Sequence, residues 1–153
     1  MSEDPRIGTT VTHRRYVPYS HAHYAGDLVD GAYSLGLFGD VATEMCIRLD
    51  GDEGLFAGYD EVRFHAPLRA GDVVEAAARL VRVGTRSRRL ELTVHVVCRG
   101  RPDRSPSAAE VLAEPLLVTS AVGTVVVPPL EAGSDTPDTR ESIRSPEPQK
   151  GPA

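Results

Sequence analysis

Two carboxylates, Asp40 and Glu44, stand four residues apart in an otherwise apolar stretch that runs from Asp30 to Leu49. A spacing of four residues places both side chains on one face of a helix. The stretch is about five helical turns long, and apolar residues cover nearly its whole circumference, which is typical of a central, buried helix. Buried acids are costly unless they are paired or used. We therefore expect a buried acid pair in which one carboxyl group has a raised pKa.

Strands on both sides of this helix are predicted from alternation and turn residues. Asp30 is a plausible N-cap, and the helix should end near Asp50-Gly51-Asp52, where Gly and Asp follow its last apolar residues. A loop precedes the helix and a turn spans residues 67–72; a second turn spans residues 84–86, and a loop or insertion spans residues 100–110. The predicted strands cover residues 9–17, 59–66, 73–83, 90–96 and 116–127.

This order of elements predicts an α+β fold, in which one antiparallel sheet of about five strands wraps around one long central helix. The expected organisation is an N-terminal arm (1–8), one domain (9–128) and a C-terminal tail (129–153) that is too polar to fold. A sheet of this kind has open edges and a thin core. We therefore expect a dimer joined edge to edge, or a higher assembly such as a hexamer.

The composition excludes several classes of function. A net charge of −5 gives no electrostatic reason to expect nucleic-acid binding. No segment approaches the length of a membrane span, and the N-terminus lacks the pattern of a signal peptide. Cys46 and Cys98 form no CxxC pair and are expected to be reduced, as in a cytoplasmic protein. Neither a metal-ligand cluster of known spacing nor a glycine-rich phosphate loop is present, so we expect no metal site.

Three stretches resemble a known family in the right order: HAHYAGDLVDGA at 21–32, LFGDVATEMCIRLDGDEGLFAGYDEVRFHAPLRAGD at 37–72 and EPLLVTSAVGTVVV at 114–127. They are similar to the hotdog fold of acyl-CoA thioesterases and hydratases, and more closely to the 3-aminobutyryl-CoA and β-alanyl-CoA ammonia-lyases within that fold. The Pro-rich insertion near 102–106 and the extended tail depart from the family pattern.

The resemblance implies a lyase that reversibly eliminates ammonia, or another amine, from a 3-aminoacyl thioester to give the 2-enoyl thioester. This reaction needs a base for the proton next to the thioester, donors for the enolate oxygen and a place for an ammonium group. We assign the base and the ammonium site to Asp40 and Glu44, without deciding which does which. The alternative is that both acids lie on the helix surface or pair with arginines from the sheet.

Further candidates surround the expected start of the helix. Backbone N–H groups near Asp30, Gly31 and Ala32 are free to bind the enolate oxygen, and Gly31 would let the thioester carbonyl approach closely. Two loop histidines precede the helix; His23 is the preferred general acid or base, and His21 is a second candidate for binding substrate. Ordinary capping and hydrogen-bonding roles are the alternatives.

Two other candidate sites lie in the strands and turns. Tyr59, in the GYDEV segment, is expected to line the acyl pocket or donate to the substrate, unless it only packs. Arg86, Arg88 and Arg89 form a basic cluster at a turn and are candidates for the phosphates of CoA. No cofactor is expected beyond the CoA or phosphopantetheine that carries the substrate, and an acyl carrier protein is an alternative carrier.

The main competing function is that of an acyl-CoA or carrier-protein thioesterase, including one that acts on a β-amino acyl thioester. A single helix carboxylate would suffice for that reaction. An enoyl-CoA hydratase fits less well, because no Asp and His pair of the hydratase type follows a strand. A non-catalytic thioester-binding module would have no use for paired buried acids, since leucine serves an inert core better.

Overall fold

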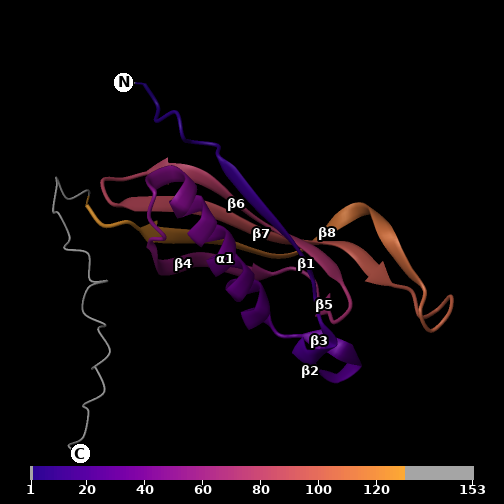
Figure 1. Ribbon diagram of the computed structural model, residues 1–153. Helices are drawn as coiled ribbons and strands as arrows, with labels where there is room; N and C mark the ends of the chain where they lie inside the picture. The colour runs from indigo at the N-terminus through magenta and orange to yellow at the C-terminus, as the bar shows by residue number, and fades with distance from the viewer. Residues whose placement is uncertain (1, 130–153) are drawn as a thin grey trace, which may run out of the picture.

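The computed structural model describes residues 2–129 and shows one long helix lying across a curved antiparallel sheet (Figure 1). The expected α+β hotdog arrangement is confirmed, with the five strands of the main sheet in the order β1-β6-β7-β8-β4. The predicted tail lies outside the described residues, apart from its first residue. The elements are β1 (Thr10–Tyr16), η1 (Tyr19–His21), β2 (Ala22–Tyr24), η2 (Ala25–Asp27), β3 (Leu28–Val29), α1 (Gly31–Asp50), β4 (Leu55–Phe64), β5 (Leu68–Arg69), β6 (Val73–Val83), β7 (Ser87–Gly100) and β8 (Ala109–Val126).

Helix α1 begins and ends with the capping residues that its sequence predicts. The side chain of Asp30 accepts a hydrogen bond from the N–H of Tyr33 at 3.3 Å, as an N-cap does. At the other end Gly51 has φ +66°, and its N–H donates to the carbonyl of Ile47. That left-handed conformation favours glycine, which explains why the helix stops there. No helix within residues 2–129 combines the length and apolarity needed to cross a membrane.

The helix is covered by protein on only one side, which corrects the expectation that it is buried all round. Its sheet-facing side includes Leu37, Phe38, Val41 and Met45, all of them buried. The opposite side is exposed in this chain, because the fold supplies one sheet and no second layer. The exposed positions are Ala32, Gly36, Asp40, Thr43, Ile47 and Arg48.

The sheet contributes the other half of the core through strict alternation. In β6 the buried residues are Val74, Ala76, Ala78 and Leu80, so the alanine-rich segment is a strand as predicted. Strand β7 buries every second residue from Leu90 to Val96 in the same way. The predicted strands are confirmed, although β7 and β8 both extend further than their apolar runs indicated.

A second, smaller sheet joins two regions that the sequence predicted as a loop and a turn. It consists of β2, β3 and β5, and β3 pairs with β5 through Leu28 opposite Arg69 and Val29 opposite Leu68. Strands of two or three residues are too short for alternation to reveal them. This small sheet holds the chain that leads into α1 against the turn that precedes β6, and it therefore fixes the start of the helix.

Strand β4 forms one edge of the main sheet and is the most exposed strand beside the helix. Leu55 is 72% exposed and Phe64 is 59% exposed. Its pairing with β8 is interrupted between Asp60 and Arg63, where Glu61 has φ +53°. This edge therefore presents both unpaired backbone groups and apolar side chains, a combination that favours pairing with another strand.

Strands β7 and β8 continue beyond the rest of the sheet as a two-stranded arm, seen at the right of Figure 1. The predicted insertion at 100–110 forms its tip, where Arg101 binds both Asp103 and Glu110. The register jumps between the pairs Val96–Leu116 and Cys98–Val111, so residues 112–115 bulge out of the ladder. The proline-rich loop is therefore an ordered hairpin end, stabilised by ion pairs.

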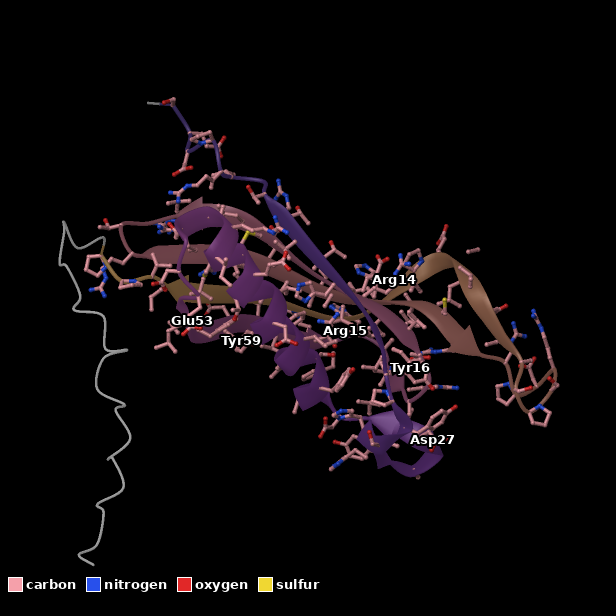
Figure 2. All side chains as sticks on the ribbon, viewed as in Figure 1. Arg14, Arg15, Tyr16, Asp27, Glu53 and Tyr59 are labelled. Carbon is pink, nitrogen blue, oxygen red and sulfur yellow. The ribbon has the colours of Figure 1, made fainter. Side chains whose placement is uncertain are left out.

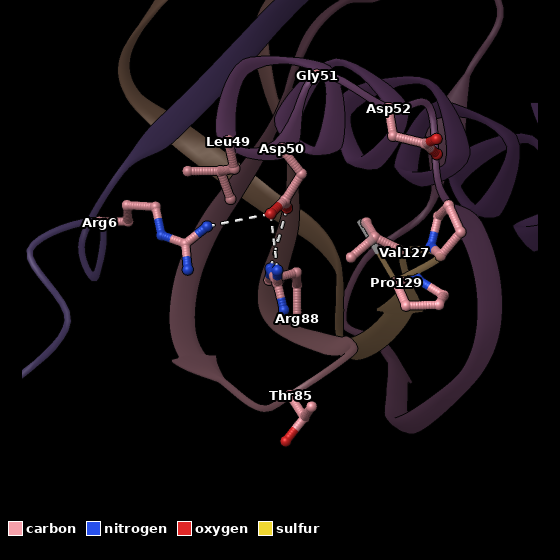
Figure 3. Close-up of a pocket in the computed structure, with 10 residues that line it drawn as sticks. Arg6, Leu49, Asp50, Gly51, Asp52, Thr85, Arg88, Val127 and Pro129 are labelled. Carbon is pink, nitrogen blue, oxygen red and sulfur yellow. Dashed lines mark hydrogen bonds and ion pairs between the residues drawn. The ribbon is translucent and has the colours of Figure 1, made fainter. Parts of the chain in front are cut away.

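The C-terminal end of α1 is fastened to the sheet and to the N-terminal arm by one carboxylate. Asp50 accepts hydrogen bonds from Arg88 of β7 at 2.7 and 3.0 Å, and from Arg6 at 3.1 Å (Figure 3). The side chain of Arg88 is only 6% exposed and also donates to two backbone carbonyls. These bonds lower the pKa of Asp50, with the hydrogen bond from Arg88 as the largest cause.

Replacement of Arg88 by methionine should lower the free energy of unfolding by about 3 kcal/mol, because the largely buried Asp50 carboxylate loses two of its three hydrogen bonds and keeps only the one from Arg6. Arg86→Met, at an exposed position two residues earlier, is the matched control. Denaturant unfolding at pH 7 measures both. Because the pKa of Asp50 in the folded protein is below its ordinary value of 3.8, ionised Asp50 stabilises the fold at pH values above 3.8. This stabilisation is lost as the pH falls through the lowered pKa. The difference in unfolding free energy between wild type and Arg88→Met should therefore shrink below about pH 4. Equal losses in both variants would contradict this account.

Candidate active site

The start of α1 lies at a cavity of 460 Å³ between the helix, the end of β4 and the small sheet. Among the hydrogen bonds of residues 2–129, none uses the N–H of Gly31 or Ala32. Free donors at the positive end of a helix suit an oxygen that acquires negative charge. The N–H groups of Gly31 and Ala32 are thus free within the described residues, next to the N-cap Asp30. Their role in binding an oxyanion stays a prediction.

A phenylalanine ring covers Gly31. A Cβ atom at this position would lie 2.4 Å from the ring of Phe64, so glycine is required for the ring to lie where it does. The sequence analysis explained Gly31 by the approach of a thioester, whereas in this chain the close neighbour is Phe64. The ring comes from the exposed end of β4 and lines the same cavity, which makes it part of the candidate site.

Two hydroxyl groups at the wall of this cavity were missed from the sequence. Thr119 of β8 donates to Ser34 at 2.9 Å, and both side chains are buried. The bond joins the first turn of the helix to the sheet and holds the cavity wall in place. Alternation along β8 indicates that Thr119 faces inward, but nothing in the sequence indicates its partner. His65, at the end of β4, also lines the cavity and contacts Ser120 at 2.7 Å.

The two loop histidines lie on either side of the helix start. His21 packs against the ring of Tyr33, with ring centroids 4.7 Å apart. It lines a second depression, of 480 Å³, together with Tyr33 and Asp40. His23 is exposed, and its Nδ1 lies 3.8 Å from a carboxylate oxygen of Asp30. Both histidines are thus near the helix N-terminus, as predicted, although neither is held in a tight contact with a catalytic group.

The expected pair of buried acids is wrong for the single chain. Asp40 is exposed, and Glu44 is 38% exposed. They share one face of α1 but have different surroundings. Glu44 accepts from Arg48 at 2.9 Å and contacts Nε2 of His13 at 3.0 Å. The hydrogen bond from Arg48 is the largest cause that lowers the pKa of Glu44, followed by that from His13, so this group ionises easily and is not the raised-pKa member of a pair.

Asp40 differs from Glu44 in having no partner. No hydrogen bond or ion pair within residues 2–129 involves its carboxylate, which is one of the groups lining the second depression. An ionised carboxylate without a cationic partner is available for a ligand. The two acids therefore differ: Glu44 is hydrogen-bonded to Arg48 and His13, whereas Asp40 has no such partner among residues 2–129.

His13 is a residue that the sequence analysis missed. It lies on β1, where residues 11, 13 and 15 share the face that looks toward α1. Arg15, on this face, is labelled in Figure 2 beside the helix, and its Nη2 lies 3.5 Å from Nδ1 of His13. The alternation of β1 could have predicted this contact, because a histidine that faces the helix lies opposite the acids of α1 and can pair with one of them.

Tyr59 packs and does not line either cavity at the helix start. Its hydroxyl donates to the carbonyl of Leu35 at 3.2 Å, and its ring stacks on Phe56 with centroids 4.3 Å apart. Figure 2 shows the residue beneath the helix. Burial raises the pKa of its phenol. Tyr59 thus supports α1 on β4, as in the packing alternative, and its expected role in the acyl pocket stays a prediction.

The three arginines of the predicted phosphate cluster do not point to one place. Arg88 is buried against Asp50 and is not available to a phosphate. Arg89 pairs with Asp60 of β4 at 3.1 Å. Arg86 lies exposed in the turn before β7. Successive strand residues point to opposite faces, which is why neighbours in the sequence separate in this way.

Comparison with known proteins places this architecture in a recognised class. A sequence profile described as the thioesterase superfamily matches residues 28–101, which include α1 and the strands up to β7. A hexameric hotdog-fold thioesterase of Campylobacter jejuni is 21% identical, with a TM-score of 0.62, and the match covers 74% of this chain and 79% of that one. This similarity shows the fold.

Two closer relatives define the family. A 3-aminobutyryl-CoA ammonia lyase of Acetoanaerobium sticklandii is 50% identical over 107 residues, which are 70% of this chain and 85% of the relative. The structure of a β-alanyl-CoA:ammonia lyase from Clostridium propionicum is 31% identical, with a TM-score of 0.75, and covers 79% of this chain and 86% of that one. The chain therefore belongs to the aminoacyl-CoA ammonia-lyase family, as its sequence motifs predicted.

Carbon-13 NMR should show the Glu44 carboxyl group titrating below its ordinary pKa of 4.5. Replacing Arg48 by glutamine should raise this pKa, and His13→Gln should raise it less, because the Arg48 hydrogen bond is the larger cause. Arg14→Gln is the control, since Arg14 pairs with Glu75 elsewhere on β1 and β6. A Glu44 pKa that does not respond to Arg48→Gln would show that the contact is not formed in solution.

Proposed function

We propose that this protein catalyses the reversible elimination of ammonia from a 3-aminoacyl-CoA to give the 2-enoyl-CoA. A 50% identical relative is a 3-aminobutyryl-CoA ammonia lyase, and that identity carries the proposal. The proposed site comprises the free N–H groups at the start of α1 and the unpartnered carboxylate of Asp40. CoA takes part as the carrier of the substrate.

The reaction needs a base, donors for the enolate oxygen and a place for the ammonium group. A base removes the proton from C2, and the electrons of that C–H bond form the enolate of the thioester. The enolate then collapses to the C2–C3 double bond as the C3–N bond breaks, and the nitrogen leaves with its electron pair as ammonia. The proton taken by the base returns to ammonia, so that an enoyl thioester and an ammonium ion are the products.

The surroundings of the two acids favour Asp40 as the base or the ammonium partner. Glu44 is held by Arg48 and His13, and its lowered pKa makes it a weaker base for a carbon acid than an ordinary glutamate. Asp40 is free to accept a proton or to bind a cation. Gly31 and Ala32 offer their N–H groups to the enolate oxygen, at the positive end of the helix dipole.

Distance along α1 requires these groups to come from two copies of the chain. Gly31 and Asp40 are nine residues apart in the same helix, which at 1.5 Å per residue is about 13 Å. The amino nitrogen of a 3-aminoacyl thioester lies only about 4 Å from its carbonyl carbon, given ordinary bond lengths. One substrate cannot reach both groups of one chain, so a second copy supplies one of them.

The exposed surfaces of the chain support such an assembly. Strand β4 carries exposed Leu55 and Phe64 at an open sheet edge, beside the uncovered face of α1. Pairing of two β4 edges would extend the sheet and place the helix of one copy near the cavity of the other. The similar thioesterase of Campylobacter jejuni is hexameric. We propose a homodimer built through β4, with a hexamer as the larger assembly.

For the CoA phosphates, the exposed Arg86 remains the first proposed ligand, because Arg88 is buried against Asp50. Arg89 is a second proposed ligand, although it points elsewhere and pairs with Asp60. Hydrolysis of the thioester is the alternative activity, since the matched profile is that of the thioesterase superfamily. Release of free CoA from acyl-CoA substrates, detected with a thiol reagent, distinguishes the two reactions.

Asp40→Asn should lower kcat/KM for ammonia elimination by about 10²-fold or more, because it removes the carboxylate that acts as base or as ammonium partner. Glu44→Gln should have a smaller effect, because Glu44 is already engaged by its neighbours. The assay follows 2-enoyl-CoA formation from 3-aminobutyryl-CoA, with Glu75→Gln as the control on the far side of the sheet. Wild-type activity in Asp40→Asn would remove this residue from the proposed mechanism.

A mixture of two inactive variants should regain activity if each site uses two chains. Asp40→Asn loses the acid. Gly31→Pro removes one N–H donor and, because any Cβ atom at this position displaces the Phe64 ring, also disturbs the donor end of the site. In random heterodimers one site in two is intact, so mixing the subunits by refolding should restore about a quarter of wild-type activity. No recovery, with heterodimers demonstrated by mass spectrometry, would place both groups in one chain.

A further inference from the structure

The depression beside the first two turns of α1 has the chemistry of a cation site. It has a volume of 480 Å³ and is lined from α1 by Ala32, Tyr33, Gly36 and Asp40, with His21 across from them. Its aromatic wall is the contact between His21 and Tyr33, whose rings are 4.7 Å apart and tilted by 56°. Aromatic faces and a carboxylate are the groups that bind small ammonium ions in proteins.

Within residues 2–129, no charged group near this depression pairs with Asp40. Burial raises the pKa of Tyr33, with smaller opposing effects from the charges of Arg15 and Asp40. Arg15 is directed along β1, because its Nη1 donates to the carbonyl of Arg14 and its Nη2 lies 3.5 Å from His13. Asp30, the second acid at the rim, is occupied in capping the helix.

We propose that this depression binds the amino group of the substrate as a primary ammonium ion, with Asp40 as counter-ion and the Tyr33 ring as cation–π partner. Gly36 then determines how large a substituent on the nitrogen is accepted. This inference rests on the proposed function and on the second copy that brings the thioester to Asp40. It adds Tyr33 and Gly36 as residues that determine amine specificity.

The surroundings of Gly36 leave room for a substituent on the nitrogen. A Cβ atom built on Gly36 meets nothing within 4 Å, so a side chain there would fill the depression without a clash. Gly39 has equally open surroundings but does not line the depression, which makes it a matched position on the same helix.

The first experiment measures the KM for ammonium in the addition reaction, with crotonyl-CoA as the acceptor. Tyr33→Leu keeps apolar bulk but loses the π face, and should raise this KM about 5- to 30-fold, the range of a partly desolvated cation–π contact. Tyr33→Phe keeps the ring and should raise it less. The KM for crotonyl-CoA should change by less than about twofold in both, because the acyl group binds elsewhere. A purely structural role would lower kcat through loss of folded enzyme and leave the KM for ammonium unchanged.

The second experiment compares ammonium with methylammonium as the donor. Gly36→Val should lower the ratio of kcat/KM for methylammonium to that for ammonium by about tenfold, since one buried methylene discriminates by this much. Gly39→Val should leave the ratio unaltered, and valine suits a helix better than glycine at either position. An unchanged ratio in Gly36→Val overturns the role of Gly36, and an unchanged ammonium KM in Tyr33→Leu overturns the subsite.

Failure of the proposed function has a different signature. If the wild-type protein forms no adduct from crotonyl-CoA with either amine, the lyase assignment fails and the ammonium subsite fails with it. If the wild type adds ammonia and both variants behave as the wild type does, the lyase assignment stands and only the subsite is rejected. Mass spectrometry of the CoA products separates these results.

Discussion

The contact between α1 and the concave face of the sheet is the one on which the rest of the structure depends. Phe38, Val41 and Met45 are fully buried there, and burial of each such side chain contributes about 1.5–3 kcal/mol. A sheet can cover only one side of a helix, so the other side stays open in a single chain. The exposed carboxylate, the small residues around it and the uncovered edge strand all follow from this one-sided packing.

The same contact places the chemistry at the ends and on the outer side of the helix. The caps at Asp30 and Gly51 fix where α1 begins and stops, and the Arg88–Asp50 pair fastens its far end to β7. At the near end, the bond between Ser34 and Thr119 and the small sheet of β2, β3 and β5 hold the free N–H groups beside a cavity. The core thus holds α1 in place, while the groups proposed to bind substrate, the N–H groups of Gly31 and Ala32 and the carboxylate of Asp40, stay exposed.

Much of this fold was predictable because its strands alternate and its helix carries its own caps. The alanine-rich segment of β6 was correctly predicted as a strand, and Asp30 and Gly51 correctly predicted where α1 begins and ends. The surroundings of Asp40 and Glu44 were not predictable, because periodicity gives the face of a helix but not what covers it. The prediction of one arginine cluster was wrong for a related reason. Arg88 and Arg89 are adjacent in sequence but face opposite sides of β7.

The β7–β8 arm has a consequence for how proteins of this kind diverge. Beyond the bulge at 112–115 its two strands are joined to each other by the pairs Cys98–Val111, Arg99–Glu110 and Gly100–Ala109, and its tip is closed by its own ion pairs. Residues can be gained or lost there without shifting the register of the strand positions that face α1. The hairpin is therefore a place where evolution can vary length and sequence freely, while the catalytic frame keeps its spacing.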